Sequence, residues 1–165
     1  MDGALARLRA RVTTVVPVEQ VALAECRGRV LAQDLMALRA NPPSANSAVD
    51  GYGFAGAALD ELVTLPLAPG RSAAGEPYEG ALPQGHALRI LTGAIMPEGM
   101  QTVVLQEDVE VSGGKLQFYG PLKQGANTRR AGEDFEAGDP ILKAGRRLRG
   151  EDAALLAAAG YAEVP

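Results

Sequence analysis

Polar side chains suited to chemistry gather in four short segments of the chain. The first is residues 46–52, Asn-Ser-Ala-Val-Asp-Gly-Tyr, in which Asp50 stands before a glycine. Asp or Asn beside Gly favours a tight turn that exposes a carboxylate next to backbone N–H groups. Such a carboxylate can hold a metal ion or accept a proton, and Asn46 and Ser47 are candidate substrate-binding residues beside it. Taken alone, the segment is more typical of a turn with no chemistry.

The next two segments follow runs of apolar residues. Residues 89–94, Arg-Ile-Leu-Thr-Gly-Ala, end a predicted strand with Thr92 and Gly93, which places a hydroxyl and a free amide at the rim of a sheet. These groups could cradle an oxyanion, although an ordinary strand end explains the segment better when it is taken alone. Glu107, which follows the run at residues 102–105, is a candidate metal ligand or, more simply, a solvated strand end.

The fourth segment is residues 127–134, Asn-Thr-Arg-Arg-Ala-Gly-Glu-Asp. The guanidinium groups of Arg129 and Arg130 match the geometry of a phosphate, and Asp134 is a candidate ligand for Mg²⁺. A surface loop whose charges pair with one another is an equally good interpretation of these residues alone.

The composition limits the classes of protein to which the chain can belong. Its 165 residues are 47% apolar and 22% charged, which excludes a wholly disordered chain. A net charge of −4 disfavours a nucleic-acid partner, because proteins that bind a duplex carry a basic face. The single cysteine, Cys26, excludes an internal disulfide framework. No apolar run approaches about 18 residues and the N-terminus lacks the layout of a signal peptide, so we expect a cytoplasmic protein with no membrane partner.

The ends of the chain are predicted to hold helices and short strands. Apolar residues recur at helical spacing before Pro17, at Leu5, Leu8, Val12 and Val15. Residues 18–23 favour a strand, and residues 26–32 favour a short helix that turns Val30 and Leu31 inward. Residues 153–159 are strongly helix-forming, and Gly160 suits the position after a helix. The strand that begins near residue 161 stops abruptly, which indicates a piece of a longer protein.

The middle of the chain has a different texture. Between residues 51 and 145 a Gly or Pro occurs every few residues, and Gly113-Gly114 separates two short apolar runs as a hairpin turn would. The Pro-rich block at residues 41–47 indicates a domain boundary. We therefore predict a β-rich α+β fold, in which a small twisted sheet or partly open β-barrel domain, residues 46–145, is inserted in a helix-plus-strand domain formed by residues 1–45 and 146–165.

Taken in order, these motifs resemble one family. The resemblance rests on residues 46–52 after a Pro-Pro pair, residues 89–94 followed by Pro97-Glu98-Gly99, residues 103–107, residues 127–134 and the final Ala-Leu-Leu-Ala-Ala-Ala-Gly at 154–160. Together they are similar to the N-terminal region of molybdopterin molybdenumtransferases, the MoeA and gephyrin E-domain family. The similarity covers essentially the whole chain.

The resemblance implies a transferase of molybdenum-cofactor assembly, which inserts molybdate into adenylylated molybdopterin with release of AMP and with help from Mg²⁺. It implies a homodimer in which the helix-plus-strand domain supports dimerisation and the β-rich domain reaches the partner subunit's active-site cleft. The molybdopterin-binding domain is expected after residue 165 or in the partner. Asp50, Thr92 and Asp134 fall on the family's functional positions, so the resemblance implies that they are catalytic residues. We further expect Asp50, Glu107 and Asp134 as metal ligands and Asn46, Ser47, Arg129 and Arg130 as substrate-binding residues.

The chain also departs from the family pattern, at Ser44-Ala45, Gly53-Phe54 and Met100-Gln101. These departures leave room for a different loop before Asp50 and for a weakened site. The main alternative function is a non-catalytic dimerisation or scaffold module of the same fold. A third interpretation, a β-rich binding domain unrelated to the cofactor, requires the ordered series of motifs to arise by chance.

Overall fold

The structure, a computed structural model, describes residues 2–12 and 16–165. Its backbone contacts divide the chain into two compact units. We name residues 1–36 with 140–165 the terminal unit and residues 37–139 the central unit. That the chain forms two domains with boundaries at 45/46 and 145/146 stays a prediction.

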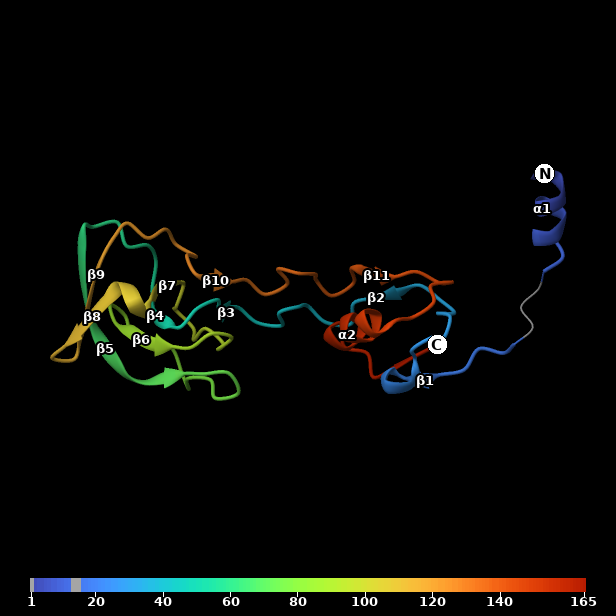
Figure 1. The fold of residues 1–165 in the computed structure, drawn as a ribbon. Helices are drawn as coiled ribbons and strands as arrows, with labels where there is room; N and C mark the ends of the chain where they lie inside the picture. Colours follow the sequence, from blue (N-terminus) through green and yellow to red (C-terminus); the bar gives the residue numbers. More distant parts are fainter. Residues whose placement is uncertain (1, 13–15) are drawn as a thin grey trace. The chain divides into compact units, whose positions relative to one another are not determined.

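The central unit is built on a six-stranded sheet that curls into a half-open barrel (Figure 1). The strand order is β7-β4-β6-β5-β9-β8. The bounds are β4 Gly51–Phe54, β5 Leu62–Ser72, β6 Ala87–Ile90, β7 Thr102–Leu105, β8 Val109–Ser112 and β9 Lys115–Tyr119, with the short 3₁₀ helix η2 at Gln106–Asp108. All neighbouring strands pair antiparallel except β5 and β6, which are parallel. The predicted β-rich fold with a partly open sheet is confirmed.

The hairpin between β8 and β9 forms where the sequence predicts it. Gly113 and Gly114 have φ angles of 58° and 72°, and only glycine adopts two successive positive values readily. The turn sets the register Ser112↔Lys115, which places Leu116 and Phe118 on the buried face. Phe118 on β9 packs against Phe54 on β4 with 5.4 Å between ring centroids, so apolar burial joins two strands that are not neighbours in the sheet order.

Two segments of the central unit, residues 37–47 and 128–139, run antiparallel beside each other (Figure 1). The short strands β3 Asn46–Ser47 and β10 Thr128–Arg129 pair at one end of this ribbon. At the other end Ala37 donates its N–H to Asp139 O. The ribbon thus places the motif at residues 46–52 beside the motif at residues 127–134, although the two are far apart in sequence.

The terminal unit combines two small sheets with a helix. β1 Val21–Ala22 pairs with β12 Glu163–Val164, and β2 Leu35–Met36 pairs with β11 Pro140–Leu142. The helix α2, Gly150–Ala158, follows the prediction closely, and Gly160 has a φ of 100° just beyond it. Cys26, Leu31 and Leu156 belong to the buried cluster of this unit, so Cys26 is a core residue.

The first forty residues differ most from expectation. The helix α1 spans Asp2–Arg9, and its apolar side chains Leu5 and Leu8 are exposed, because no described residue packs against them. Short helices without packing are marginal; Val15 lies outside the described residues. The predicted strand at 18–23 is reduced to β1 followed by the 3₁₀ helix η1, Leu23–Glu25.

The helix predicted over residues 26–32 is wrong. Gly28 has a φ of 84°, which no right-handed helix accommodates, and the chain turns there instead. As a result Leu31 is buried as predicted, but Val30 is exposed. No helix among the described residues is long and apolar enough to cross a membrane.

Candidate functional site

The Asp50 carboxylate and Thr92 meet at one end of strands β4 and β6. Asp50 directly precedes β4, and Thr92 lies two residues after β6. The antiparallel register pairs Gly51 with Ile90, so the start of β4 lies beside the end of β6. Thr92 donates both its backbone N–H and its hydroxyl to Asp50 Oδ1, each at 2.7 Å.

This arrangement depends on a glycine at position 51. A Cβ built on Gly51 would lie 2.0 Å from the carbonyl oxygen of Val104 on the neighbouring strand β7. A backbone oxygen cannot move away without disturbing the sheet, so the close approach of β4 and β7 requires the missing side chain. The glycine of the Asp-Gly pair is thus required by strand packing and is not only a signal for a turn.

The hydrogen bonds from Thr92 keep Asp50 ionised. The backbone N–H and then the hydroxyl of Thr92 lower the pKa of Asp50; burial opposes this shift, and the positive charge of Arg89 makes a smaller contribution that lowers the pKa. Both Thr92 groups donate to Oδ1, and Oδ2 accepts no hydrogen bond from the described residues. The carboxylate therefore presents one free, negatively charged oxygen.

Arg89 and Gln106 surround this carboxylate and were not singled out from the sequence. Arg89 lies over the ring of Tyr52, 5.0 Å from its centroid, and donates to Gly51 O and to Gln106 Oε1. Gln106 donates its backbone N–H to Asp50 O at 3.1 Å and its side-chain amide to Glu107 Oε1 at 3.1 Å. Gln106 thus forms hydrogen bonds with both Asp50 and Glu107 and links the two residues. The one feature of the sequence that pointed to Arg89 and Gln106 was their position within or beside the motifs.

Asp134 belongs to a second cluster, on the ribbon of residues 37–47 and 128–139. Arg129 donates to Asp134 Oδ1 at 2.5 Å, and Asn41 donates to Oδ2 at 2.8 Å. Arg129 also pairs with Glu133 at 3.3 Å. These carboxylates raise the pKa of Arg129, and hydrogen bonds from Arg130 N–H and Arg129 lower the pKa of Glu133. Both oxygens of Asp134 are therefore engaged within the chain.

The remaining predicted residues are Ser47, Asn46 and Arg130. Ser47 is buried, and its hydroxyl donates to Val49 O at 2.6 Å, so it serves the turn before Asp50. Asn46 is half-buried and pairs with Arg129 across β3 and β10. Arg129 and Arg130 line a cavity of about 520 Å³ together with Thr128, Met96 and Met100. The Arg130 side chain forms no ion pair with the described residues.

The structure brings Asp50 and Thr92 into direct contact, and Gln106 connects Glu107 to Asp50. Asp134 belongs to a separate ion-pair cluster with Arg129. Among residues 2–12 and 16–165, no group of three or more His, Cys, Asp or Glu side chains is placed to hold a metal ion. The chain therefore offers single carboxylates rather than a complete metal cage.

Comparison with known proteins identifies the family. Residues 1–160 match the family described as "MoeA N-terminal region (domain I and II)". The chain belongs to this family. It is 36% identical over 165 residues to a molybdopterin molybdenumtransferase of Haemophilus influenzae and 39% identical over 154 residues to one of Synechococcus elongatus. The matches cover 99% and 90% of this chain, but only 41% and 38% of those relatives.

Solved structures agree with this assignment to the MoeA N-terminal region. The crystal structure of the molybdopterin biosynthesis moeA protein from Pyrococcus horikoshii OT3 superposes with a TM-score of 0.88 at 32% sequence identity. The match covers 99% of this chain and 44% of that one. The chain thus spans about two fifths of the length of these relatives.

Proposed function

We propose that this chain is the N-terminal part of a molybdenum-cofactor biosynthesis transferase, which inserts molybdate into adenylylated molybdopterin with release of AMP. The observation that carries the proposal is the ionised Asp50 carboxylate, fixed by two hydrogen bonds from Thr92 and open at Oδ2. The names of the relatives at 36% and 39% identity support the reaction class.

The charge of the central unit supports a role for Mg²⁺. This unit contains seven Lys or Arg and thirteen Asp or Glu, a net charge of −6, which by itself repels a phosphate-bearing substrate. Mg²⁺ is commonly held by one or two carboxylates together with substrate phosphates and water. The free oxygen of Asp50 fits such a site, with Glu107, which is linked to Asp50 through Gln106, as a second carboxylate. Bound there, the ion would offset the charge of the phosphate groups.

The other residues take supporting roles in this proposal. The Thr92 hydroxyl gives its only proton to Asp50, so Thr92 positions the carboxylate. Asp134, which also accepts a hydrogen bond from Asn41, holds the guanidinium of Arg129 beside the cavity that it shares with Arg130. From that position both arginines can stabilise negative charge on the substrate.

The proposal places these residues at a shared site. The chain forms a cytoplasmic homodimer, and the central unit supplies Asp50, Arg129 and Arg130 to a cleft of the partner subunit. A further domain holds the pterin there. This arrangement accounts for single carboxylates in place of a complete metal cage, because the remaining ligands come from water, substrate and partner.

A non-catalytic dimerisation or scaffold module is the second candidate. The engagement of both Asp134 oxygens in hydrogen bonds within the chain favours it, since such a carboxylate can be purely structural. The free Oδ2 of Asp50 favours the transferase, because a scaffold gains nothing from an open carboxylate.

The test is molybdenum-cofactor formation by the full-length protein with Asp50→Asn. Asn keeps the size of the side chain but removes the charge, and we expect formation to fall by more than about hundredfold. Asp108→Asn, on the exposed η2 turn nearby, is the matched control and should retain activity. Wild-type cofactor formation by the Asp50→Asn protein would refute the transferase role and leave the scaffold.

A further inference from the structure

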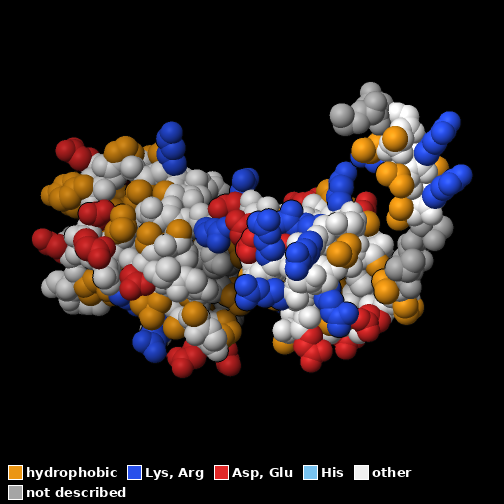
Figure 2. Space-filling view, turned by 45° about the vertical axis from the view of Figure 1, so that its right-hand side comes forward, with side chains coloured by type: hydrophobic (Ala, Val, Ile, Leu, Met, Phe, Trp, Pro, Cys, Tyr) orange, Lys and Arg blue, Asp and Glu red, His pale blue; other side chains and the backbone are white. Residues whose placement is uncertain are grey.

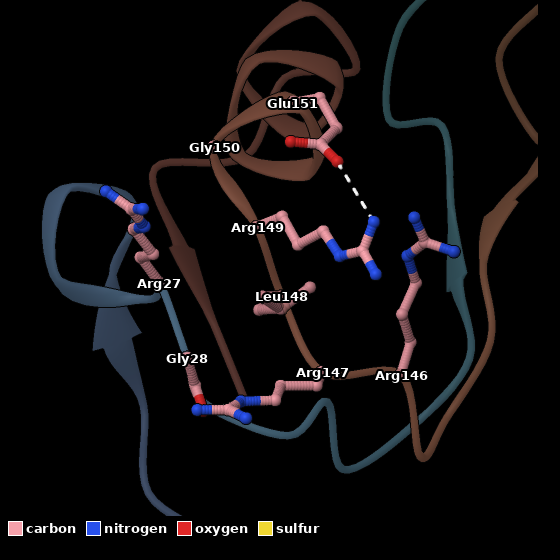
Figure 3. Close-up of a pocket in the computed structure, with 8 residues that line it drawn as sticks. All are labelled: Arg27, Gly28, Arg146, Arg147, Leu148, Arg149, Gly150 and Glu151. Carbon is pink, nitrogen blue, oxygen red and sulfur yellow. Dashed lines mark hydrogen bonds and ion pairs between the residues drawn. The ribbon is translucent and has the colours of Figure 1, made fainter.

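The terminal unit holds a cavity of about 660 Å³ whose walls are dominated by arginine. Figure 3 shows Arg27 and Gly28 on one segment, facing residues 146–151 on another. Hydrogen bonds join the two segments, from Gly28 N to Leu148 O and from Leu148 N to Arg29 O, both at 2.8 Å. The wall therefore has a fixed backbone, from which the side chains of Arg27, Arg146, Arg147 and Arg149 extend.

The four arginines outnumber the carboxylates near them. Arg146 pairs with the buried Asp152 at 2.7 Å, and Arg149 lies 3.7 Å from Glu151. Arg147 donates only its Nε to Gly28 O at 3.4 Å, and Arg27 has no ion pair among the described residues. Arg27 and Arg147 are thus left without an ion-pair partner among the described residues, and two such positive charges in the lining of one cavity favour a bound anion.

The positive charge belongs to the side chains rather than to the end of a helix. The N-terminus of α2 is already capped, because Asp152 accepts a hydrogen bond from Arg149 N–H at 2.9 Å and Glu151 stands in the first turn. The whole terminal unit is also basic. It contains nine Lys or Arg and seven Asp or Glu, a net charge of +2 in a chain whose total is −4. Figure 2 shows several Lys and Arg side chains close together near the middle of the view, with Asp and Glu side chains beside them.

We propose that this arginine pocket binds a small phosphate-bearing anion, at a site separate from Asp50. Its volume lies in the range of small-molecule sites, about 300–1,000 Å³. Guanidinium forks match phosphate oxygens, and two unpaired arginines supply the charge. The lining contains one large apolar residue, Leu148, which is buried, and no aromatic residue. Protein interfaces rely on exposed apolar and aromatic anchors, so a small anion fits the pocket better than a protein partner.

The test is calorimetric titration of the protein with inorganic pyrophosphate at about 50 mM and about 200 mM salt. We expect saturable binding to one site that weakens at the higher salt. Each of Arg27→Gln and Arg147→Gln should weaken binding by about tenfold, because each removes a charge-assisted hydrogen bond. Arg27→Gln alone is sufficient if the Arg147 variant fails to fold, since the Arg27 side chain forms no ion pair with the described residues.

Three controls separate the site from general attraction. Arg7→Gln with Arg11→Gln removes two exposed charges from the same unit and should leave binding unchanged. Arg71→Gln, which removes an exposed charge from the central unit outside the proposed transferase site, should also leave binding unchanged. No saturable binding, equal weakening by the Arg7/Arg11 pair, loss of binding with Arg71→Gln, or tighter binding of a Glu-rich peptide than of pyrophosphate would each overturn the proposal.

Discussion

The two units of this chain differ in charge and in how they use it. The central unit carries a net charge of −6 and fixes one carboxylate, Asp50, by hydrogen bonds at the end of a sheet. The terminal unit carries +2 and collects four arginines around one cavity. A single value of −4 for the whole chain conceals this division, which is why the overall charge says little about the ligands of either unit.

The units also differ in what holds their charged groups in place. Asp50 is fixed by Thr92 at a partly open sheet end, so its oxygen remains free. Asp152, by contrast, is buried. Its two oxygens accept hydrogen bonds from the Arg146 side chain and the Arg149 N–H, and the second of these caps α2. The same residue type thus has a chemical role available in one unit and a structural role in the other.

The largest expected effect tests the sheet that supports Asp50. Gly51→Ala places a Cβ against the Val104 carbonyl, so we expect the free energy of unfolding to fall by about 3 kcal/mol. Urea denaturation measures it. Gly150→Ala in the terminal unit meets no atom within 4 Å and should change stability by less than about 0.5 kcal/mol. Equal losses of unfolding free energy for Gly51→Ala and Gly150→Ala would contradict this prediction.

A smaller effect tests the buried carboxylate of the terminal unit. Arg146→Gln leaves the charge of Asp152 without its ion-pair partner, and we expect a loss of about 2 kcal/mol in the free energy of unfolding. Arg149→Gln removes an exposed pair at 3.7 Å and the attraction of Arg149 for Asp152, which is weaker than that of Arg146, and should cost less than about 0.5 kcal/mol. If Arg146→Gln is as mild as Arg149→Gln, Asp152 does not depend on Arg146.

The pH dependence of the unfolding free energy also tests the structural role of Asp152. The Arg146 hydrogen bond, with that from Arg149 N–H, lowers the pKa of Asp152 below its unfolded value of about 3.9. The stabilisation is therefore complete above about pH 4 and is lost as the pH falls through the folded pKa. Asp152→Asn should show a smaller decrease in unfolding free energy between pH 7 and pH 3 than the wild type. Parallel curves for the two proteins would contradict this assignment.

Local signals in the sequence predicted much of the fold. The Gly113-Gly114 turn, the strand at residues 102–105 and the C-terminal helix each have a cause within a few residues, and each is present. The longest strand, β5, was not predicted, because Pro66, Pro69 and Gly70 interrupt its pattern. Pairing with β9 and β6 supplies what its own sequence lacks, and such pairing is a property of the whole sheet.

The candidate site was predictable in its members but not in its contacts. Asp50 and Thr92 are 42 residues apart, and only the β4–β6 register brings them together. The roles of Arg89 and Gln106 follow from that register too, so residue types alone did not reveal them. The engagement of Asp134 by Asn41 depends on the pairing of two distant segments in the ribbon.

The most direct measurement of the central claim is the titration of the Asp50 carboxyl carbon by NMR. In the wild type we expect a pKa below that of an ordinary aspartate, because Thr92 donates two hydrogen bonds to the charged form. Thr92→Val removes the hydroxyl and should raise the pKa of Asp50, while Thr92→Ser should keep it low. An ordinary pKa in the wild type, or one unchanged by Thr92→Val, would contradict the account.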